Sequence, residues 1–248
     1  MTSRIKCSIS QYFPLLQLQK KIQYKFCSSY TMTKMPILYV DEASPPARFV
    51  MMTASLLNIE LDIKKIDLFA GEHKKLAYTK INPLQKVPAL VVDDNAILDS
   101  HAAAIYLCQQ VSSQVLYPKE NILLMARVNE IMFFNCSILF KLDSEILSSY
   151  FAGKWPVTQS KIEEWYHALD YLETKLNKNT WLTCEKMYLC DLCVMQTISS
   201  VLQLLPLLDR HKKIKCWLNE FEKLECIAIN KRGIARLKYY INLYKPFK

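Results

Sequence analysis

The order of strand-like and helix-like patterns constrains the fold of this 248-residue chain more than any other feature. Apolar residues alternate or cluster in short runs typical of strands, and they recur at helical spacing in between. The segments expected are strands at 36–40, 60–66, 87–92 and 96–98, and helices at 48–57 and 100–110. Their order is strand–helix–strand followed by strand–strand–helix, which predicts an α/β module.

Strand signals largely vanish beyond residue 111. The segment 111–121 contains Ser112-Ser113 and Tyr117-Pro118, which are typical of a linker. The segments with helical spacing are then 122–150, 160–176, 189–205 and 213–224. The predicted domains are an N-terminal extension at 1–34 that is disordered or a targeting segment, an α/β domain at 35–111, a linker at 112–120 and an all-helical domain at 121–248.

The net charge of +9 is unevenly placed along the chain. Residues 1–34 hold six basic residues and no acid, so the other 214 residues carry 26 basic and 23 acidic groups. Such a nearly balanced surface argues against nucleic acid as a partner. Only three glycines are present, and no glycine-rich phosphate loop is seen. No run reaches the ~18 apolar residues that span a bilayer, so we expect no membrane segment.

The first 34 residues are basic and acid-free, which matches the composition of a mitochondrial transit peptide. A long or misassigned start is favoured instead, because Met32 and Met35 stand just before the first strand. We therefore expect a cytoplasmic protein. Nine cysteines at irregular spacing indicate reduced, mostly buried thiols. The CxxC at 190–193 lacks a second pair to complete a zinc site, so no metal is expected.

Three short motifs indicate a site for a small anionic peptide. The step Val87-Pro88 can present main-chain groups to a peptide-like ligand. Asp99-Ser100 opens a helix, so Asp99 can take an ammonium while the Ser100 hydroxyl and the helix N-terminal amides take a carboxylate. Ser44, ahead of another helix, can stabilise a thiolate. The ligand that fits this set of groups is glutathione.

With these motifs the chain resembles the cytosolic glutathione transferases, specifically the insect delta and epsilon classes. The resemblance covers residues 36 to about 230, and its markers are 44–48, 68–73, 82–88, 99–102 and 116–119. Within the epsilon class the chain is most similar to the Noppera-bo subgroup, which is associated with ecdysteroid biosynthesis. This closer placement rests on Phe69, the Asp-Ser-His triplet at 99–101 and Asp143.

The resemblance implies a thioredoxin-like N-terminal domain and an all-α C-terminal domain. It also implies a homodimeric enzyme with glutathione as co-substrate. In this family Ser44 would be catalytic, donating its hydroxyl to the glutathione sulfur and so favouring the thiolate, which is the nucleophile. The glutathione-binding residues it implies are Ser44, His73, Gln85, Val87, Pro88, Asp99, Ser100 and His101. Pro88 is expected to follow a cis peptide bond.

Two positions depart from the family pattern. Gln85 stands where epsilon relatives usually have a histidine, although an amide can still donate to the glycyl carboxylate. Tyr188 replaces the Ser or Thr expected three residues before Asp191 in a capping arrangement. Losing an N-cap side chain typically costs ~1 kcal/mol of stability.

The second substrate is expected beside the first long helix of the helical domain. Asp143 is the only charge on an otherwise apolar stripe of that helix, and a carboxylate there needs a partner. The partner is either an internal Arg or Lys, solvent at the edge of the stripe, or a ligand hydroxyl. The predicted hydrophobic substrate site comprises Pro45, Phe69, Phe140, Asp143, Ser144, Leu147 and Phe151.

The predicted function is a glutathione transferase whose Ser44-stabilised thiolate attacks an apolar electrophile. A steroid- or sterol-related ligand matches flat apolar walls with one acceptor at the end, which would connect the protein to ecdysteroid biosynthesis. The alternatives are a non-enzymatic carrier of steroids or lipids and a general detoxification transferase. An intact Ser44 and an intact Asp99-Ser100 pair favour the enzyme, because a carrier needs neither.

Overall fold

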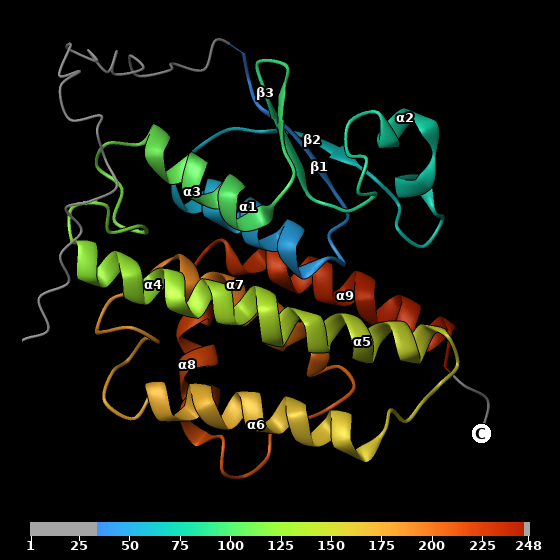
Figure 1. Ribbon diagram of the computed structural model, residues 1–248, viewed down its shortest axis with the longest axis vertical. Helices are drawn as coiled ribbons and strands as arrows, with labels where there is room; N and C mark the ends of the chain where they lie inside the picture. The colour runs from blue at the N-terminus through green and yellow to red at the C-terminus, as the bar shows by residue number, and fades with distance from the viewer. Residues whose placement is uncertain (1–33, 246–248) are drawn as a thin grey trace, which may run out of the picture. The chain divides into compact units, whose positions relative to one another are not determined.

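The computed structural model describes residues 34–245 (Figure 1). The predicted N-terminal extension, with Cys7 and Cys27, lies outside the described residues except for its last residue. The strands are β1 (Ile37–Val40), β2 (Asp62–Lys65), β3 (Ala89–Val92) and β4 (Asn95–Ile97). They form one sheet in the order β2-β1-β3-β4, with β2 parallel to β1 and the other pairs antiparallel. The predicted strand–helix–strand, strand–strand–helix order is confirmed.

Helices cover both faces of this sheet. They are α1 (Pro45–Leu56) and α3 (Ser100–Gln110) on one face, and η1 (Glu72–Lys74) and α2 (Leu76–Thr79) on the other. Side chains alternate along a strand, so Leu38 and Val40 join the large core under α1 and α3. Tyr39 instead packs with Tyr78 of α2 in a smaller cluster on the opposite face. This is the thioredoxin-like arrangement expected from the sequence.

The second half of the chain is helical. Its elements are α4 (Ile122–Phe134), the π-helical turn η2 (Asn135–Leu139), α5 (Phe140–Phe151), α6 (Gln159–Lys175), α7 (Leu189–Val201), α8 (Lys212–Glu220), the 3-10 turn η3 (Phe221–Lys223) and α9 (Ile227–Leu243). The sequence predicted one unbroken helix at 122–150, and the π-helical turn divides it. It did not predict α9, whose buried face includes Asn230 and Gly233 and therefore lacks a regular apolar spacing.

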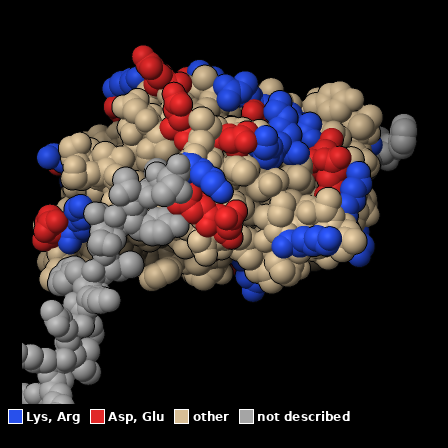
Figure 2. Space-filling view, turned by 90° about the horizontal axis from the view of Figure 1, so that it is seen from above, with Lys and Arg blue, Asp and Glu red and all other residues tan. Residues whose placement is uncertain are grey.

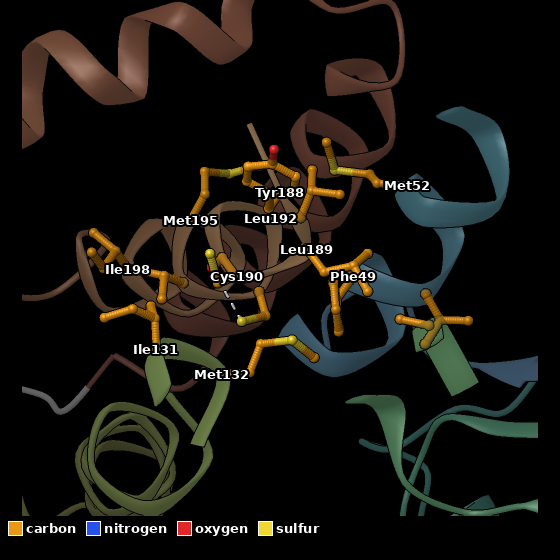
Figure 3. Close-up of a cluster of buried hydrophobic side chains, with 14 of the residues drawn as sticks. Phe49, Met52, Ile131, Met132, Tyr188, Leu189, Cys190, Leu192, Met195 and Ile198 are labelled. Carbon is orange, nitrogen blue, oxygen red and sulfur yellow. Dashed lines mark hydrogen bonds between the residues drawn. The ribbon is translucent and has the colours of Figure 1, made fainter. Parts of the chain in front are cut away.

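The core joins the sheet domain to the helices through α1 and α7. Phe49 and Met52 of α1 lie against Leu189 and Leu192 of α7, as Figure 3 shows, and all four side chains are buried. Nearly every residue of α7 is buried, so this helix is the centre of the helical half. Burying an apolar side chain of this size contributes about 1.5–3 kcal/mol. The two halves are therefore held together by a continuous hydrophobic core.

Arg48 is fully buried at the same junction and connects three parts of the fold. Its guanidinium donates to the carbonyl oxygens of Glu42 and Ala43, to Gln196 and Ser200 of α7, and to Asn230 of α9. A buried cation is tolerated only when its donors are satisfied in this way. Burial lowers the pKa of Arg48 to about 10, which still leaves it protonated at neutral pH.

Asp191 stabilises the start of α7 even though Tyr188 has replaced the usual capping residue. Its carboxylate accepts hydrogen bonds from the backbone N–H of Tyr188 at 2.9 Å, from that of Leu182 at 2.9 Å and from the Trp217 indole at 3.1 Å. Burial raises the pKa of Asp191 to about 6. The acidic residue of the capping arrangement is thus present, and its carboxylate also binds the loop at Leu182 and the helix α8 at Trp217.

The surface shown in Figure 2 carries Lys and Arg side chains interspersed with Asp and Glu. The helical segment Ile122–Phe151 is long and apolar enough to cross a membrane, as judged by length and composition alone. The sequence expectation concerned an unbroken run of about 18 apolar residues, which this segment does not contain; the segment passes on its mean hydropathy. Scattered charges such as Arg127 and Glu130 break the apolar runs without lowering the average hydropathy enough. In the structure, this segment packs against α7.

Candidate functional site

A cavity of about 450 Å³ lies where the sheet domain meets the helical half. All eight residues predicted to bind glutathione line it, although they come from four separate segments of the chain. They are Ser44, His73, Gln85, Val87, Pro88, Asp99, Ser100 and His101. The structure therefore brings the predicted glutathione-binding residues together around one cavity.

Ser44 is the residue immediately before α1 and has an extended backbone conformation. Its N–H donates to the Asp41 carbonyl oxygen at 3.0 Å, which closes a tight turn. Its hydroxyl makes no capping hydrogen bond to the helix, and the residue lines the cavity. The positive end of the helix dipole lies at this position, so the surroundings favour an anion. A thiolate near Ser44 would accept a hydrogen bond from the serine hydroxyl, and the helix dipole would stabilise its negative charge.

The loop before β3 presents Val87 to the cavity in a fixed conformation. The Val87-Pro88 peptide bond is cis, as predicted. The preceding carbonyl oxygen, that of Lys86, accepts hydrogen bonds from the Tyr78 hydroxyl and from the side chain of the fully buried Asn82. These contacts immobilise the loop, so the main-chain groups of Val87 are preorganised to pair with an extended ligand.

Asp99 and Ser100, at the start of α3, also line the cavity. One carboxylate oxygen of Asp99 caps α3 by accepting from the N–H groups of His101 and Ala102, both at 2.9 Å. The Asp99 side chain is 67% exposed, so its second oxygen stays accessible to a cation. Ser100 is buried and lines the cavity. The ammonium and the carboxylate that a γ-glutamyl group carries on one α-carbon match this pair.

Two histidines line the cavity with unpaired nitrogens. Nε2 of His101 and Nδ1 of His73 are both buried without a hydrogen-bond partner among the described residues. The His101 ring packs against Phe49 with 5.5 Å between ring centroids. Burial lowers the pKa of both histidines, and Lys74 adds to the effect at His73. Each ring is therefore predominantly neutral at neutral pH and able to donate or accept one hydrogen bond.

The hydrophobic substrate residues divide into two groups. Pro45, Phe140 and Ser144 line the cavity beside Ser44. The predicted residues that do not line it are Phe69, Asp143, Leu147 and Phe151. These four residues therefore do not share the cavity wall with Pro45 and Phe140 in this structure. Phe69, Leu147 and Phe151 belong to a separate cluster that contains Leu237 and Ile241 of α9.

Asp143 points into the protein interior and is 2% exposed. Burial raises its pKa to about 8, while the nearby charge of Arg48 acts in the opposite direction. One of its oxygens, Oδ1, is buried without a hydrogen-bond partner among residues 34–245. Among the described residues, Arg48 therefore acts on Asp143 only through its charge, and the carboxyl keeps one oxygen without a hydrogen-bond partner.

Several cavity residues were not predicted from the sequence: Asn135, Cys136, Cys193 and Thr197 among them. Asn135 and Cys136 lie in the π-helical turn η2, which inserts an extra residue and rotates the following helix by about 100°. The helix face expected from a regular α-helical spacing is therefore not the face that lines the cavity. Cys193 is buried and donates to the carbonyl oxygen of Cys190, so the CxxC is part of the packing of α7.

Comparisons with known proteins agree with this fold and site. Residues 43–110 match the model of the family described as glutathione S-transferase, N-terminal domain. Glutathione S-transferase 1 of Manduca sexta is 32% identical over 194 residues, which is 76% of this chain and 88% of that protein. Glutathione S-transferase 2 of Anopheles gambiae is 28% identical over 181 residues, 72% of this chain and 86% of its own.

Solved structures give the same result. An epsilon-class glutathione S-transferase from Musca domestica has a TM-score of 0.80 at 27% identity, over 85% of this chain and 98% of its own. A glutathione transferase homologue from Drosophila mojavensis, solved with bound glutathione, has a TM-score of 0.80 at 30% identity, over 86% and 98%. The chain therefore belongs to the glutathione S-transferase family, and it is an enzyme with the fold of the insect delta and epsilon classes.

Proposed function

We propose that Ser44 holds the sulfur of glutathione as a thiolate and that this thiolate attacks an apolar electrophile. The main observation in support is that Ser44 stands at the start of α1, makes no capping hydrogen bond with its side chain, and lines the same cavity as Val87 and Asp99. A free thiol titrates near ~8.5, so it is mostly protonated at neutral pH. One hydrogen bond to the charged form contributes about 1.5–3 kcal/mol, enough to lower that pKa by about one to two units.

The remaining cavity residues fix glutathione along its length. Val87 pairs with the cysteinyl unit through its main chain, in the conformation set by the cis bond to Pro88. Asp99 and Ser100 take the ammonium and carboxylate of the γ-glutamyl end, with His101 beside them. His73 and Gln85 donate to the glycyl carboxylate at the other end. This arrangement places the sulfur next to Ser44 and points it toward α5.

The electrophile site that we propose is the part of the cavity lined by Pro45, Phe140 and Ser144. A flat, rigid ligand such as a steroid fits beside these residues, consistent with membership of the Noppera-bo subgroup and a role in ecdysteroid biosynthesis. Asp143 directly precedes Ser144 in α5 and has an unpaired oxygen, which supports it as the group that holds a ligand hydroxyl. Because Asp143 is buried, a ligand reaches it only if the side chains that cover it move.

Two other functions are retained as alternatives. A general detoxification transferase would use the same thiolate on many small electrophiles and would not depend on Asp143. A non-enzymatic carrier would bind apolar ligands without turnover, but it would gain nothing from Ser44 and Asp99. We also propose that the protein is a cytoplasmic homodimer, as the resemblance to cytosolic glutathione transferases implies.

The test is the steady-state conjugation of glutathione to a generic aryl halide by the wild type and Ser44→Ala, with a steroid titrated in. We expect turnover that falls about 10- to 100-fold in the variant and is blocked competitively by the steroid. Asp143→Ala is expected to weaken steroid inhibition and leave glutathione affinity intact. Glu145→Ala, which alters a partly exposed residue of the same helix that pairs with Lys161, is the matched control.

Each outcome distinguishes one part of the proposal. Equal turnover by the wild type and Ser44→Ala would remove the role of Ser44. Equal steroid inhibition of the wild type and Asp143→Ala would leave the transferase and remove the hydroxyl acceptor. Binding of glutathione and steroid without any turnover would favour the carrier.

A further inference from the structure

The C-terminal helix α9 docks directly on the turn that carries Ser44. Gly233 makes the approach close, because a Cβ there would overlap the Glu42 carbonyl oxygen and the Arg48 side chain. Arg236 and Tyr240 follow at helical spacing and lie on the same side of α9. Three positions of one helix face therefore meet the segment from Asp41 to Ser44 and its neighbouring loop.

Arg236 forms a two-pronged ion pair with Asp41, which lies three residues before Ser44. The distances are 2.7 Å from Nε to Oδ1 and 3.0 Å from Nη2 to Oδ2. The Asp41 side chain is fully buried, and Arg236 is 34% exposed. Paired hydrogen bonds of this kind fix orientation as well as distance. Arg236 also lies 3.2 Å from the carboxylate of Asp67.

Besides pairing with Arg236, Asp41 binds the backbone of the two segments next to Ser44, the turn at 41–44 and the loop at 67–69. Its carboxylate accepts from the N–H of Ala43 at 2.9 Å and from the N–H of Leu68 at 3.0 Å. Its carbonyl oxygen accepts from the N–H of Ser44 at 3.0 Å. The position of Ser44 therefore depends on a carboxylate whose only cationic partner in contact, among the residues described, is Arg236.

An aromatic stack completes the same contact. The rings of Phe69 and Tyr240 are parallel to within 9°, with centroids 3.5 Å apart. The Arg236 guanidinium lies 5.2 Å from the Tyr240 centroid and 5.9 Å from that of Phe69. Such a cation–π geometry limits the freedom of the arginine side chain. The ion pair and the stack together hold the 67–69 loop and the Ser44 turn in one position.

We propose that Arg236 is a positioning residue for the transferase reaction, acting through Asp41 to hold the Ser44 hydroxyl at the glutathione sulfur. The inference rests on the proposed role of Ser44 and adds an element that the site residues do not include. Without Arg236, the buried Asp41 carboxylate loses its counter-charge and draws in water or rotates away from its backbone donors. The Ser44 turn then shifts, and a displacement of about 1 Å can reduce the rate 100-fold.

The experiment compares Arg236→Met with Arg232→Met in the full chain. Arg232 is the matched control, since it lies one turn earlier on α9 and forms a looser, exposed pair with Glu42 at 3.4 Å. The readouts are kcat and KM for glutathione, and the pKa of enzyme-bound glutathione from the ultraviolet absorbance of the thiolate. Arg236→Lys is the second variant, because it retains the charge without the two-pronged geometry and has the better prospect of folding.

We expect Arg236→Met to lower kcat about 10- to 100-fold with a smaller change in KM, and to raise the bound thiol pKa by about one unit. Arg236→Lys is expected to lie between this variant and the wild type, and Arg232→Met to stay within about twofold of the wild type. If both Arg236 variants lower thermal stability but leave kcat and the thiol pKa at wild-type values, Arg236 is only structural and the proposal is overturned.

A parallel Ser44→Ala titration separates this result from the proposed function. If Ser44→Ala raises the thiol pKa and the Arg236 variants do not, only the positioning role fails. If Ser44→Ala also leaves the pKa unchanged, the serine mechanism itself fails.

Discussion

Replacing Asp143 by asparagine should change how the stability of the protein depends on pH. The Asp143 carboxyl is 2% exposed, and burial raises its pKa from 3.8 to about 8. The native state therefore binds the proton more tightly than the unfolded chain does. The stabilisation that this carboxyl provides is complete below about pH 4 and is lost as the pH rises toward 8. Asparagine cannot ionise, so the variant lacks this loss.

The size of the effect follows from the shift. Each pKa unit corresponds to about 1.4 kcal/mol, so the wild type should lose about 4 kcal/mol more unfolding free energy than Asp143→Asn between about pH 5 and pH 9. Urea unfolding of both proteins across this range measures the difference directly. Glu145→Gln controls for the loss of a carboxylate on the same helix, where an exposed ion pair contributes only about 0–1 kcal/mol.

Parallel stability profiles for the wild type and Asp143→Asn would refute the reasoning. They would mean that Asp143 remains ionised in the native protein, with Arg48 offsetting the effect of burial. A profile that crosses, with the variant more stable at high pH and the wild type equal or better at low pH, is the predicted result.

Three further predictions concern the site and the helix that covers it. Asp99→Ala should lower the unfolding free energy by ~1 kcal/mol, because α3 loses its N-cap, and should also raise the KM for glutathione. The control Asn121→Ala removes the N-cap of α4, outside the cavity, and should cost about the same stability without changing KM. Gly233→Ala should destabilise the protein by about 3 kcal/mol or more in chemical unfolding, because no space exists for its methyl group. Cys136 should react with a thiol reagent faster as the pH rises and be protected by a bound glutathione analogue, whereas the exposed Cys216 should not be protected, as site-resolved mass spectrometry would show.

Much of the sheet domain could be predicted because its signals are local. Asp99, a favoured N-cap residue, predicts that a helix begins at Ser100, and the structure has α3 at Ser100–Gln110 as expected. The cis bond before Pro88 was expected from the family resemblance and not from the residue types, since Trp155-Pro156 is also cis and was not predicted. The residues proposed to bind glutathione lie in short motifs, so the family resemblance could name them, and the structure places all of them around one cavity.

The second-substrate side was harder because its determinants are not local. The π-helical turn η2 changes which residues of the α4–α5 segment meet the cavity, and nothing in the spacing of Asn135 or Cys136 announces it. The α9 helix carries Gly233 and Asn230 on its buried face, so its apolar pattern is weak. The ion pair between Arg236 and Asp41 joins residues 195 positions apart, a contact that one sequence cannot reveal.

The central claim is that Ser44 stabilises the glutathione thiolate, and the most direct test is a spectroscopic pH titration of enzyme-bound glutathione. We expect a thiol pKa about one to two units below the free value of ~8.5 in the wild type, returning toward that value in Ser44→Ala. The same pKa in both proteins, with glutathione bound in each, would contradict the account and show that Ser44 does not act on the sulfur.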